Sequence, residues 1–148
     1  MVAALARGAP PLPHTLFTQI SYAVFIAVGL LALWRGDRLM RAAGWVLIAA
    51  TVLTPLLQDR VNWMDPAARL LALDCALLGF FLVLAIHVGR PWMIVCAAFQ
   101  LLSTLSHPVA HLLRNIGPLT YLTIVQLFSY GVCLTLGLAV LVHRRPAR

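Results

Sequence analysis

Lysine and glutamate are both absent from this chain, and charged residues of any kind make up only 10% of its 148 positions. A soluble domain carries about 25% charged residues. Hydrophobic residues account for 62% of this chain instead, and its mean hydropathy is +0.94. This composition excludes an ordinary soluble domain and indicates an integral membrane protein of a single domain.

The sequence also lacks the motifs that accompany common catalytic and metal sites. Its three cysteines lie inside apolar runs, and no C-x-x-C or Cys/His finger spacing occurs, so neither a disulfide framework nor a zinc site is predicted. There is no G-x-S-x-G motif and no glycine-rich phosphate loop. We therefore predict no catalytic residue, no metal and no resident cofactor, and we favour a non-enzymatic role.

The chain does contain a series of long apolar runs. Each is close to the roughly 20 residues that a helix needs to cross the hydrocarbon core of a bilayer. Turn and capping signals such as Asp65-Pro66, Gly89-Arg90-Pro91 and Gly117-Pro118 separate these runs. The predicted fold is an all-α bundle of five transmembrane helices, with a short tail at 1–13 and spans at about 16–34, 39–57, 66–88, 91–113 and 118–142.

The arginines predict the orientation of this bundle. All 11 cations are arginine, and five spans place seven of them on one side: Arg35, Arg38, Arg41, Arg90, Arg144, Arg145 and Arg148. The positive-inside rule assigns that side to the cytoplasm, which puts the C-terminus inside and the N-terminus outside. Topology and anionic lipid headgroups then explain the net charge of +7 better than a nucleic-acid partner does.

One face of the span at 91–113 is polar. Gln100, Ser103, Thr104, His107 and His111 fall within about a third of the helix circumference. Each unpaired polar group in hydrocarbon costs several kcal/mol. This face is therefore expected to meet protein or a water-filled cavity.

Asp74 is the only acid inside a predicted span. An intramembrane carboxylate costs about 2.5–3.5 kcal/mol on insertion scales and often marks an ion or proton path. At about 1.5 Å per residue, polar side chains from several spans reach similar depths below the outer ends of the helices. We predict a polar layer in the outer half, with candidate ligand-binding residues Asp74, Gln100, Thr104, His107, Gln126 and Tyr22. In the structural alternative, Asp74 is protonated or bonded to His107, Gln126 or Arg69 and only ties the helices together.

Two further groups of residues lie on the predicted outer side. The loop residues Gln58, Asp59, Arg60 and Trp63 are interpreted either as a solvated loop with an aromatic anchor or as a lid over the polar layer. A haem would require axial histidines on two helices at matched depth, and the candidates are His107, His111 and His14. We favour a hydrogen-bonding role for His107 over metal ligation.

Two stretches carry a resemblance to a known group of proteins: Leu56-Leu57-Gln58-Asp59-Arg60 with Trp63, and Phe99-Gln100-Leu101 with His107. Over about residues 40–135 the chain resembles uncharacterised small multi-span inner-membrane proteins of alphaproteobacteria. This resemblance implies a multi-pass protein of the bacterial inner (cytoplasmic) membrane, and it implies no activity.

Two functional hypotheses follow from the sequence. The first is a non-enzymatic accessory or small-ligand-binding protein that contacts the lipid bilayer and acts within a larger membrane complex or as a homo-oligomer. The second is a redox or proton-coupled protein in which Asp74 and His107 handle protons, a quinone or a b-type haem.

Overall fold

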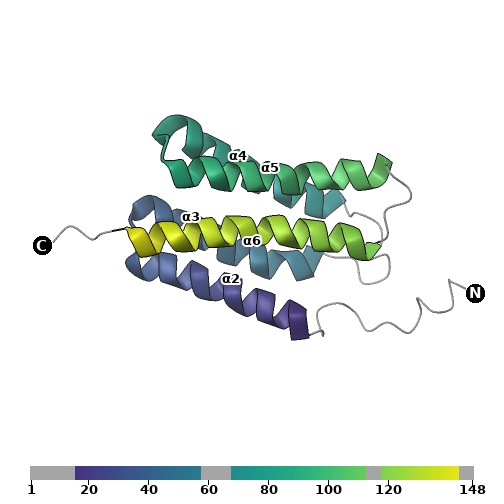
Figure 1. Cartoon of the computed structure of the whole chain (residues 1–148), viewed down its shortest axis with the longest axis horizontal. Coiled ribbons are helices and arrows are strands. Elements are labelled where there is room, and N and C mark those ends of the chain that lie inside the picture. Colours follow the sequence, from purple (N-terminus) through teal and green to yellow (C-terminus); the bar gives the residue numbers. More distant parts are fainter. Residues whose placement is uncertain (1–15, 58–67, 113–117, 144–148) are drawn as a thin grey trace, which may run out of the picture.

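The computed structural model describes residues 16–57, 68–112 and 118–143. Over these ranges the chain forms α2 (Leu16–Arg35), α3 (Arg38–Leu57), α4 (Ala68–Val88), α5 (Pro91–Leu112) and α6 (Pro118–Val142), and the described residues contain no strand (Figure 1). Each of the five helices is long and apolar enough to cross a membrane. Within the described ranges, the prediction of an all-α fold with five helices able to cross a membrane is confirmed, and the helix bounds lie within two residues of the predicted spans.

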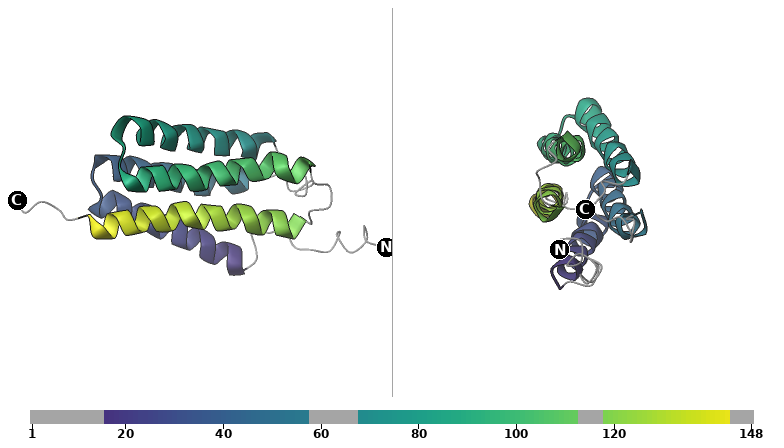
Figure 2. Two further views of the ribbon diagram at one scale, coloured as in Figure 1. Left: turned by 45° about the horizontal axis from the view of Figure 1, so that its top comes forward. Right: turned by 90° about the vertical axis from the view of Figure 1, so that its right-hand side faces the viewer.

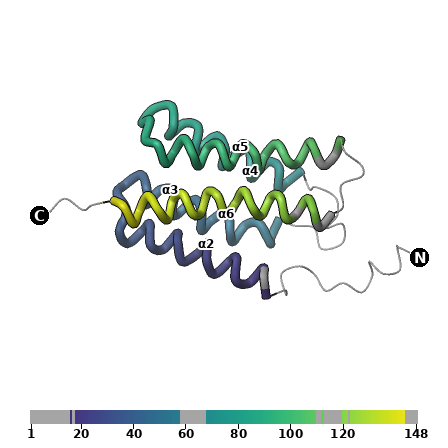
Figure 3. Tube along the Cα trace, viewed as in Figure 1, coloured from purple at the N-terminus to yellow at the C-terminus, as the bar shows by residue number. Residues whose placement is uncertain are grey.

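The helices form one bundle in which successive elements run in opposite directions (Figures 1 and 2). Helix α2 packs mainly against α3 and α6, and α5 packs mainly against α4 and α6. The starts of α2, α4 and α6 lie at one end of the bundle with the ends of α3 and α5, on the right in Figure 3. We call this the site end, because the polar cluster described below lies toward it.

The buried core is built mainly from small and medium apolar side chains, with Met40 and Phe81 as its large members. Its members are Ala32, Met40, Ala43, Phe81, Cys96, Ala97, Val132, Leu136 and Val140. Large apolar side chains such as Trp45, Ile86 and Leu134 are instead exposed on the outside of the bundle. This distribution suits a protein surrounded by lipid, because small residues let membrane helices approach closely while lipid tails solvate the bulky ones.

The opposite end of the bundle is tied together by Asp37, which directly precedes α3. Its Oδ1 accepts a hydrogen bond of 2.9 Å from the backbone N–H of Met40, the geometry of a helix N-cap. Its other carboxylate oxygen pairs with the guanidinium of Arg90, in the connection between α4 and α5. Burial raises the pKa of Asp37, but the Met40 N–H and Arg90 outweigh it, so the pKa lies below its ordinary value.

The substitution Asp37→Asn tests this ion pair, because asparagine keeps the N-cap and removes the charge. A carboxyl group with a lowered pKa in the folded state stabilises that state above its unfolded pKa, and the contribution is lost as the pH falls through the folded pKa. We expect the wild type to lose up to about 1 kcal/mol on acidification below about pH 4, since the Arg90 side chain is 42% exposed and solvent weakens the pair.

Thermal unfolding in detergent across this pH range provides the measurement. Asp37→Asn should show a smaller pH dependence than the wild type, and Asp37→Ala should be less stable than Asp37→Asn by about 1 kcal/mol because it also removes the cap. Identical pH profiles for the wild type and Asp37→Asn would show that Asp37 and Arg90 contribute no net stability.

Candidate functional site

A polar cluster joins α4 and α5 in the half of the bundle nearer the site end. Helix α4 ends at Val88, the next residue Gly89 has a positive φ of 68° that terminates the helix, and Pro91 begins α5. This short connection makes α4 and α5 an antiparallel pair. It brings Asp74 of α4 alongside the polar face of α5, because both lie a similar number of residues from the turn.

Asp74 is the centre of this cluster. Its Oδ1 accepts a hydrogen bond of 3.1 Å from Nε2 of Gln100, and its Oδ2 accepts one of 3.0 Å from the hydroxyl of Ser103. Nε2 of His107 lies 2.9 Å from the same Oδ2. Thr104 donates to the carbonyl oxygen of Gln100 and lies 3.4 Å from the backbone oxygen of Asp74. Both carboxylate oxygens therefore have protein partners, as a polar group in hydrocarbon requires.

The residues that bond Asp74 are almost completely enclosed. Gln100, Ser103, Thr104 and His107 are each less than 9% exposed, while the side chain of Asp74 is 17% exposed. The spacing of three and four residues along α5 aligns these four side chains on one face, which explains why they reach the same carboxylate.

His107 extends the cluster to a third helix. Its Nδ1 lies 2.6 Å from the hydroxyl of Tyr121 in α6, and the two rings meet edge to face with centroids 5.7 Å apart. When the carboxylate is ionised and the imidazole is neutral, Nε2–H donates to Asp74, so Nδ1 is the acceptor and Tyr121 the donor. We call this continuous connection across α4, α5 and α6 the Asp74–His107–Tyr121 chain.

The Asp74–His107–Tyr121 chain lies within two helical turns of the site end. His107 and Tyr121 are five and three residues from the ends of their helices, or about 8 and 5 Å at 1.5 Å per residue. Asp74 is six residues from the described start of α4, or about 9 Å. A protonatable group at this depth is near the membrane surface and far from the opposite side.

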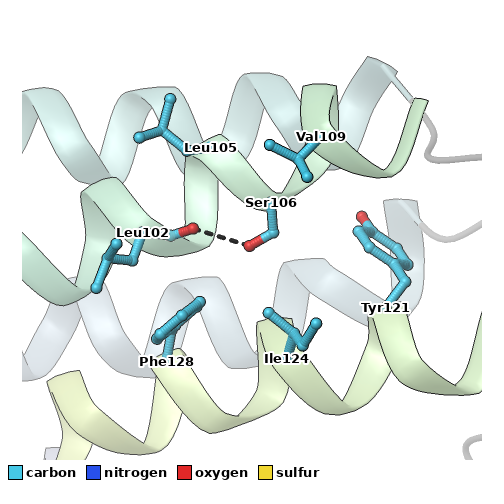
Figure 4. Close-up of a pocket in the computed structure, with 7 residues that line it drawn as sticks. All are labelled: Leu102, Leu105, Ser106, Val109, Tyr121, Ile124 and Phe128. Carbon is cyan, nitrogen blue, oxygen red and sulfur yellow. Dashed lines mark hydrogen bonds between the residues drawn. The ribbon is translucent and has the colours of Figure 1, made fainter. Parts of the chain in front are cut away.

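A shallow apolar groove of about 230 Å³ lies next to the Asp74–His107–Tyr121 chain, between α5 and α6 (Figure 4). Leu102, Leu105 and Val109 form its α5 wall, and Ile124 and Phe128 form its α6 wall. Its polar lining residues are Ser106 and Tyr121. Tyr121 therefore belongs both to the groove and to the Asp74–His107–Tyr121 chain.

The structure brings together four of the six predicted polar-layer residues: Asp74, Gln100, Thr104 and His107. Tyr22 and Gln126 are half-buried, and no hydrogen bond connects either of them with Asp74 in the part of the chain that the structure describes. Nε2 of Gln126 is buried without a partner there. Of the contacts suggested for Asp74, the one with His107 is present, while none with Gln126 or Arg69 occurs within the same ranges.

A second polar contact links α2 with α6. The hydroxyl groups of Ser21 and Tyr130 lie 2.5 Å apart, and the ring of Tyr130 packs edge to face against Phe25. This contact lies on different helix faces from the Asp74 cluster. The described residues therefore contain a second polar contact between helices besides the hydrogen bonds of Asp74.

Several sequence predictions lie outside the described residues. These are the loop residues Gln58, Asp59, Arg60 and Trp63, together with His14; the side chain of His111 is likewise not described. The described residues contain no group of three or more His, Cys, Asp or Glu side chains that could hold a metal ion. His107 would have to give up its hydrogen bond to Asp74 or Tyr121 in order to ligate a haem iron.

Two members of the cluster were not among the predicted site residues. Ser103 lies on the polar face of α5 that the sequence identified, and its spacing from Gln100 and His107 was a sufficient signal. Tyr121 gave a weaker signal, namely its position near the start of its span, at a depth similar to that of His107.

Comparisons with protein-family models, curated proteins and solved structures found no match to this chain. The fold and the site therefore define its class by themselves. It is a multi-pass membrane protein whose described residues form five helices long and apolar enough to cross a membrane. A carboxylate–imidazole–phenol chain with a buried imidazole joins three of these helices.

Proposed function

We propose that this protein is a non-enzymatic, proton-responsive protein of the bacterial inner membrane, and that the Asp74–His107–Tyr121 chain binds and releases a proton at the outer face. The observation that carries the proposal is the buried ring of His107, which is bonded through one nitrogen to a carboxylate and through the other to a phenol. Histidine is the side chain best suited to change charge near neutral pH.

The chemistry of the chain supports proton exchange. When a proton arrives at the hydroxyl oxygen of Tyr121, the phenolic hydrogen can move to Nδ1 of His107, so that Tyr121 keeps one hydrogen. The resulting imidazolium is then stabilised by the carboxylate of Asp74, which also accepts hydrogen bonds from Gln100 and Ser103. Asp74 and Tyr121 are the titratable groups that face His107 from α4 and α6, and each is hydrogen-bonded to it.

The proposed outer location rests on the distribution of arginine. Of the described arginines, Arg35, Arg38, Arg41 and Arg90 lie at the end of the bundle opposite the site end, and Arg69 lies at the site end. The positive-inside rule favours the end with more arginines as cytoplasmic. Protons would then enter the chain from the periplasmic side of the membrane.

The second candidate function is that of an accessory protein that binds a small ligand or acts within a larger membrane complex or a homo-oligomer. The observation in its favour is that Asp74, Ser103, Gln100 and His107 already satisfy one another, as in a static tie between helices. In that case the cluster would keep a single protonation state over the pH range in which the protein is folded.

Infrared difference spectroscopy of the protein in lipid nanodiscs separates the two. We expect a pH step within the range in which the protein stays folded to change both the carboxylate bands of Asp74 and the imidazole bands of His107. Asp74→Asn should abolish the carboxylate change, whereas Ser103→Ala, which removes one hydrogen bond and no titratable group, should retain it. A wild-type spectrum in which neither group changes over this range would contradict the proposed function and support the static tie.

A further inference from the structure

The groove between α5 and α6 has an unusual hydrogen-bonding character. The hydroxyl of Ser106 donates its single hydrogen to the carbonyl oxygen of Leu102 at 2.8 Å, inside the helix (Figure 4). The hydroxyl of Tyr121 donates to Nδ1 of His107 when the imidazole gives its Nε2–H to Asp74. Both groove hydroxyls have then used their hydrogens and offer only lone pairs.

A groove that offers only acceptors selects a ligand that brings a donor. Ketones, esters and the carbonyl groups of an oxidised quinone contribute acceptors alone, so they bring no hydrogen for the lone pairs of the groove hydroxyls. An ammonium group would bring donors together with a charge, but the groove is lined by no acidic side chain to balance it. A neutral hydroxyl brings a donor without a charge, and it meets both conditions.

The size and position of the groove restrict the rest of the ligand. Sites that enclose a whole drug-sized ligand have volumes of about 300–1,000 Å³, and this groove of about 230 Å³ is smaller. Its walls are apolar apart from the two hydroxyls, and Leu102, Leu105 and Val109 in its α5 wall are exposed on the outside of the bundle. A lipid tail would contact this surface, because α5 and α6 are long and apolar enough to cross a membrane. Such a groove holds the hydroxyl-bearing end of a molecule whose remaining apolar part stays in the bilayer.

We propose that this groove binds the hydroxyl end of a neutral, lipid-soluble phenol or alcohol, with Tyr121 accepting its hydrogen bond. The inference deepens the proposed function and rests on it, because Tyr121 is also the terminal member of the Asp74–His107–Tyr121 chain. A ligand hydroxyl bonded to Tyr121 is the next donor along that chain. The quinone suggested by the sequence is thereby narrowed to its hydroxyl-bearing reduced form and to other molecules with the same group.

A long-chain alkylphenol and its methyl ether provide a matched pair of probes, since the ether has nearly the same shape and no donor. Binding to the full-length protein in nanodiscs is measured by NMR with a fluorine label on each probe, at a pH of about 8. We expect the phenol to bind about tenfold more tightly than the ether, which corresponds to about 1.4 kcal/mol. Equal affinities would overturn the proposal.

Two pairs of variants locate the site. Tyr121→Phe should reduce phenol binding to the level of the ether, whereas Tyr22→Phe, which removes a phenolic hydroxyl from α2, should not. Ile124→Trp should fill the groove and abolish binding of both probes, whereas Leu134→Trp, on the exposed surface of α6, should have no effect. Binding that survives Ile124→Trp would place the phenol elsewhere and overturn the proposal.

The probe comparison tests the ligand of the groove, and the infrared experiment tests the proton-responsive function, so each can contradict its own proposal without the other. A phenol preference that depends on Tyr121, without any pH-dependent change in Asp74 or His107, would support the ligand and contradict the proton-responsive function. A pH-dependent change in these groups with equal binding of phenol and ether would support the proposed function and overturn the inference about the groove. If Tyr121→Phe does not fold, the probe comparison on the wild type and Ile124→Trp still decide.

Discussion

Replacing Asp74 with alanine is expected to destabilise the bundle by about 2–4 kcal/mol. The substitution removes the common acceptor of Gln100, Ser103 and His107, all of which are buried. A buried polar group that loses its partner costs about 1–3 kcal/mol, and interhelical hydrogen bonds in membranes are worth about 0.6 kcal/mol each on average and up to about 1.7. Reversible unfolding in mixed micelles, at a fixed detergent composition, measures this loss.

Asp74→Asn is the matched variant, and we expect it to cost only about 1 kcal/mol. An asparagine oxygen can still accept the bond from Gln100. Its amide can donate to Ser103 and to Nε2 of His107, provided that the imidazole adopts the other tautomer and donates from Nδ1 to Tyr121. Nitrogen NMR of the His107 ring would detect this change of tautomer.

The comparison separates stability from protonation. If alanine and asparagine at position 74 cost the same, the hydrogen bonds of the cluster contribute little beyond the charge itself. If neither substitution alters stability, the packing of α4 against α5 does not depend on the cluster.

The five helices could be predicted from the sequence because membrane solvation leaves few alternatives. A run of about 20 apolar residues has to satisfy its backbone hydrogen bonds internally, and a helix is the solution available to a single segment. Several helix ends could also be predicted from the sequence, since Pro91 and Pro118 each begin a helix and Gly89 directly follows the end of one. The ion pair between Asp37 and Arg90 was not predicted, because it depends on two connections that are distant in the sequence.

The site was predictable within one helix and only partly between helices. Spacing alone places Gln100, Ser103 and His107 on one face of α5, and lipid excludes that face from the outside. The depth of Asp74 along its helix correctly predicted that it meets this face, but Gln126 and Tyr22 lie at similar depths and were predicted to meet it as well. Depth fixes position along the membrane normal and leaves open which helices are neighbours and which faces they present. Those depend on packing, which the sequence expresses only weakly.

Packing of this kind is clearest where α2 crosses α3. Gly29 and Gly44 face each other there, and a Cβ added to Gly44 would lie 2.8 Å from the backbone oxygen of Gly29 and 3.0 Å from the Cβ of Ala32. The close approach of two backbones is how small residues hold membrane helices together without a hydrophobic driving force. We therefore expect Gly44→Ala to destabilise the fold by about 1–3 kcal/mol.

The same change at Gly79 provides the control for Gly44→Ala. A Cβ at Gly79 would meet nothing within 4 Å, so Gly79→Ala should be neutral or should stabilise the helix by about 0.5–1 kcal/mol, because alanine restricts the unfolded backbone more than glycine does. Gly29→Ala should also destabilise the fold, since its Cβ would lie 2.5 Å from Cγ1 of Ile48 and 3.2 Å from the backbone oxygen of Gly44. Unfolding in mixed micelles ranks the three variants. If Gly44→Ala and Gly79→Ala had the same effect, the stability of the α2–α3 pair would not depend on the approach of their backbones, and intrinsic helix propensity would account for both results.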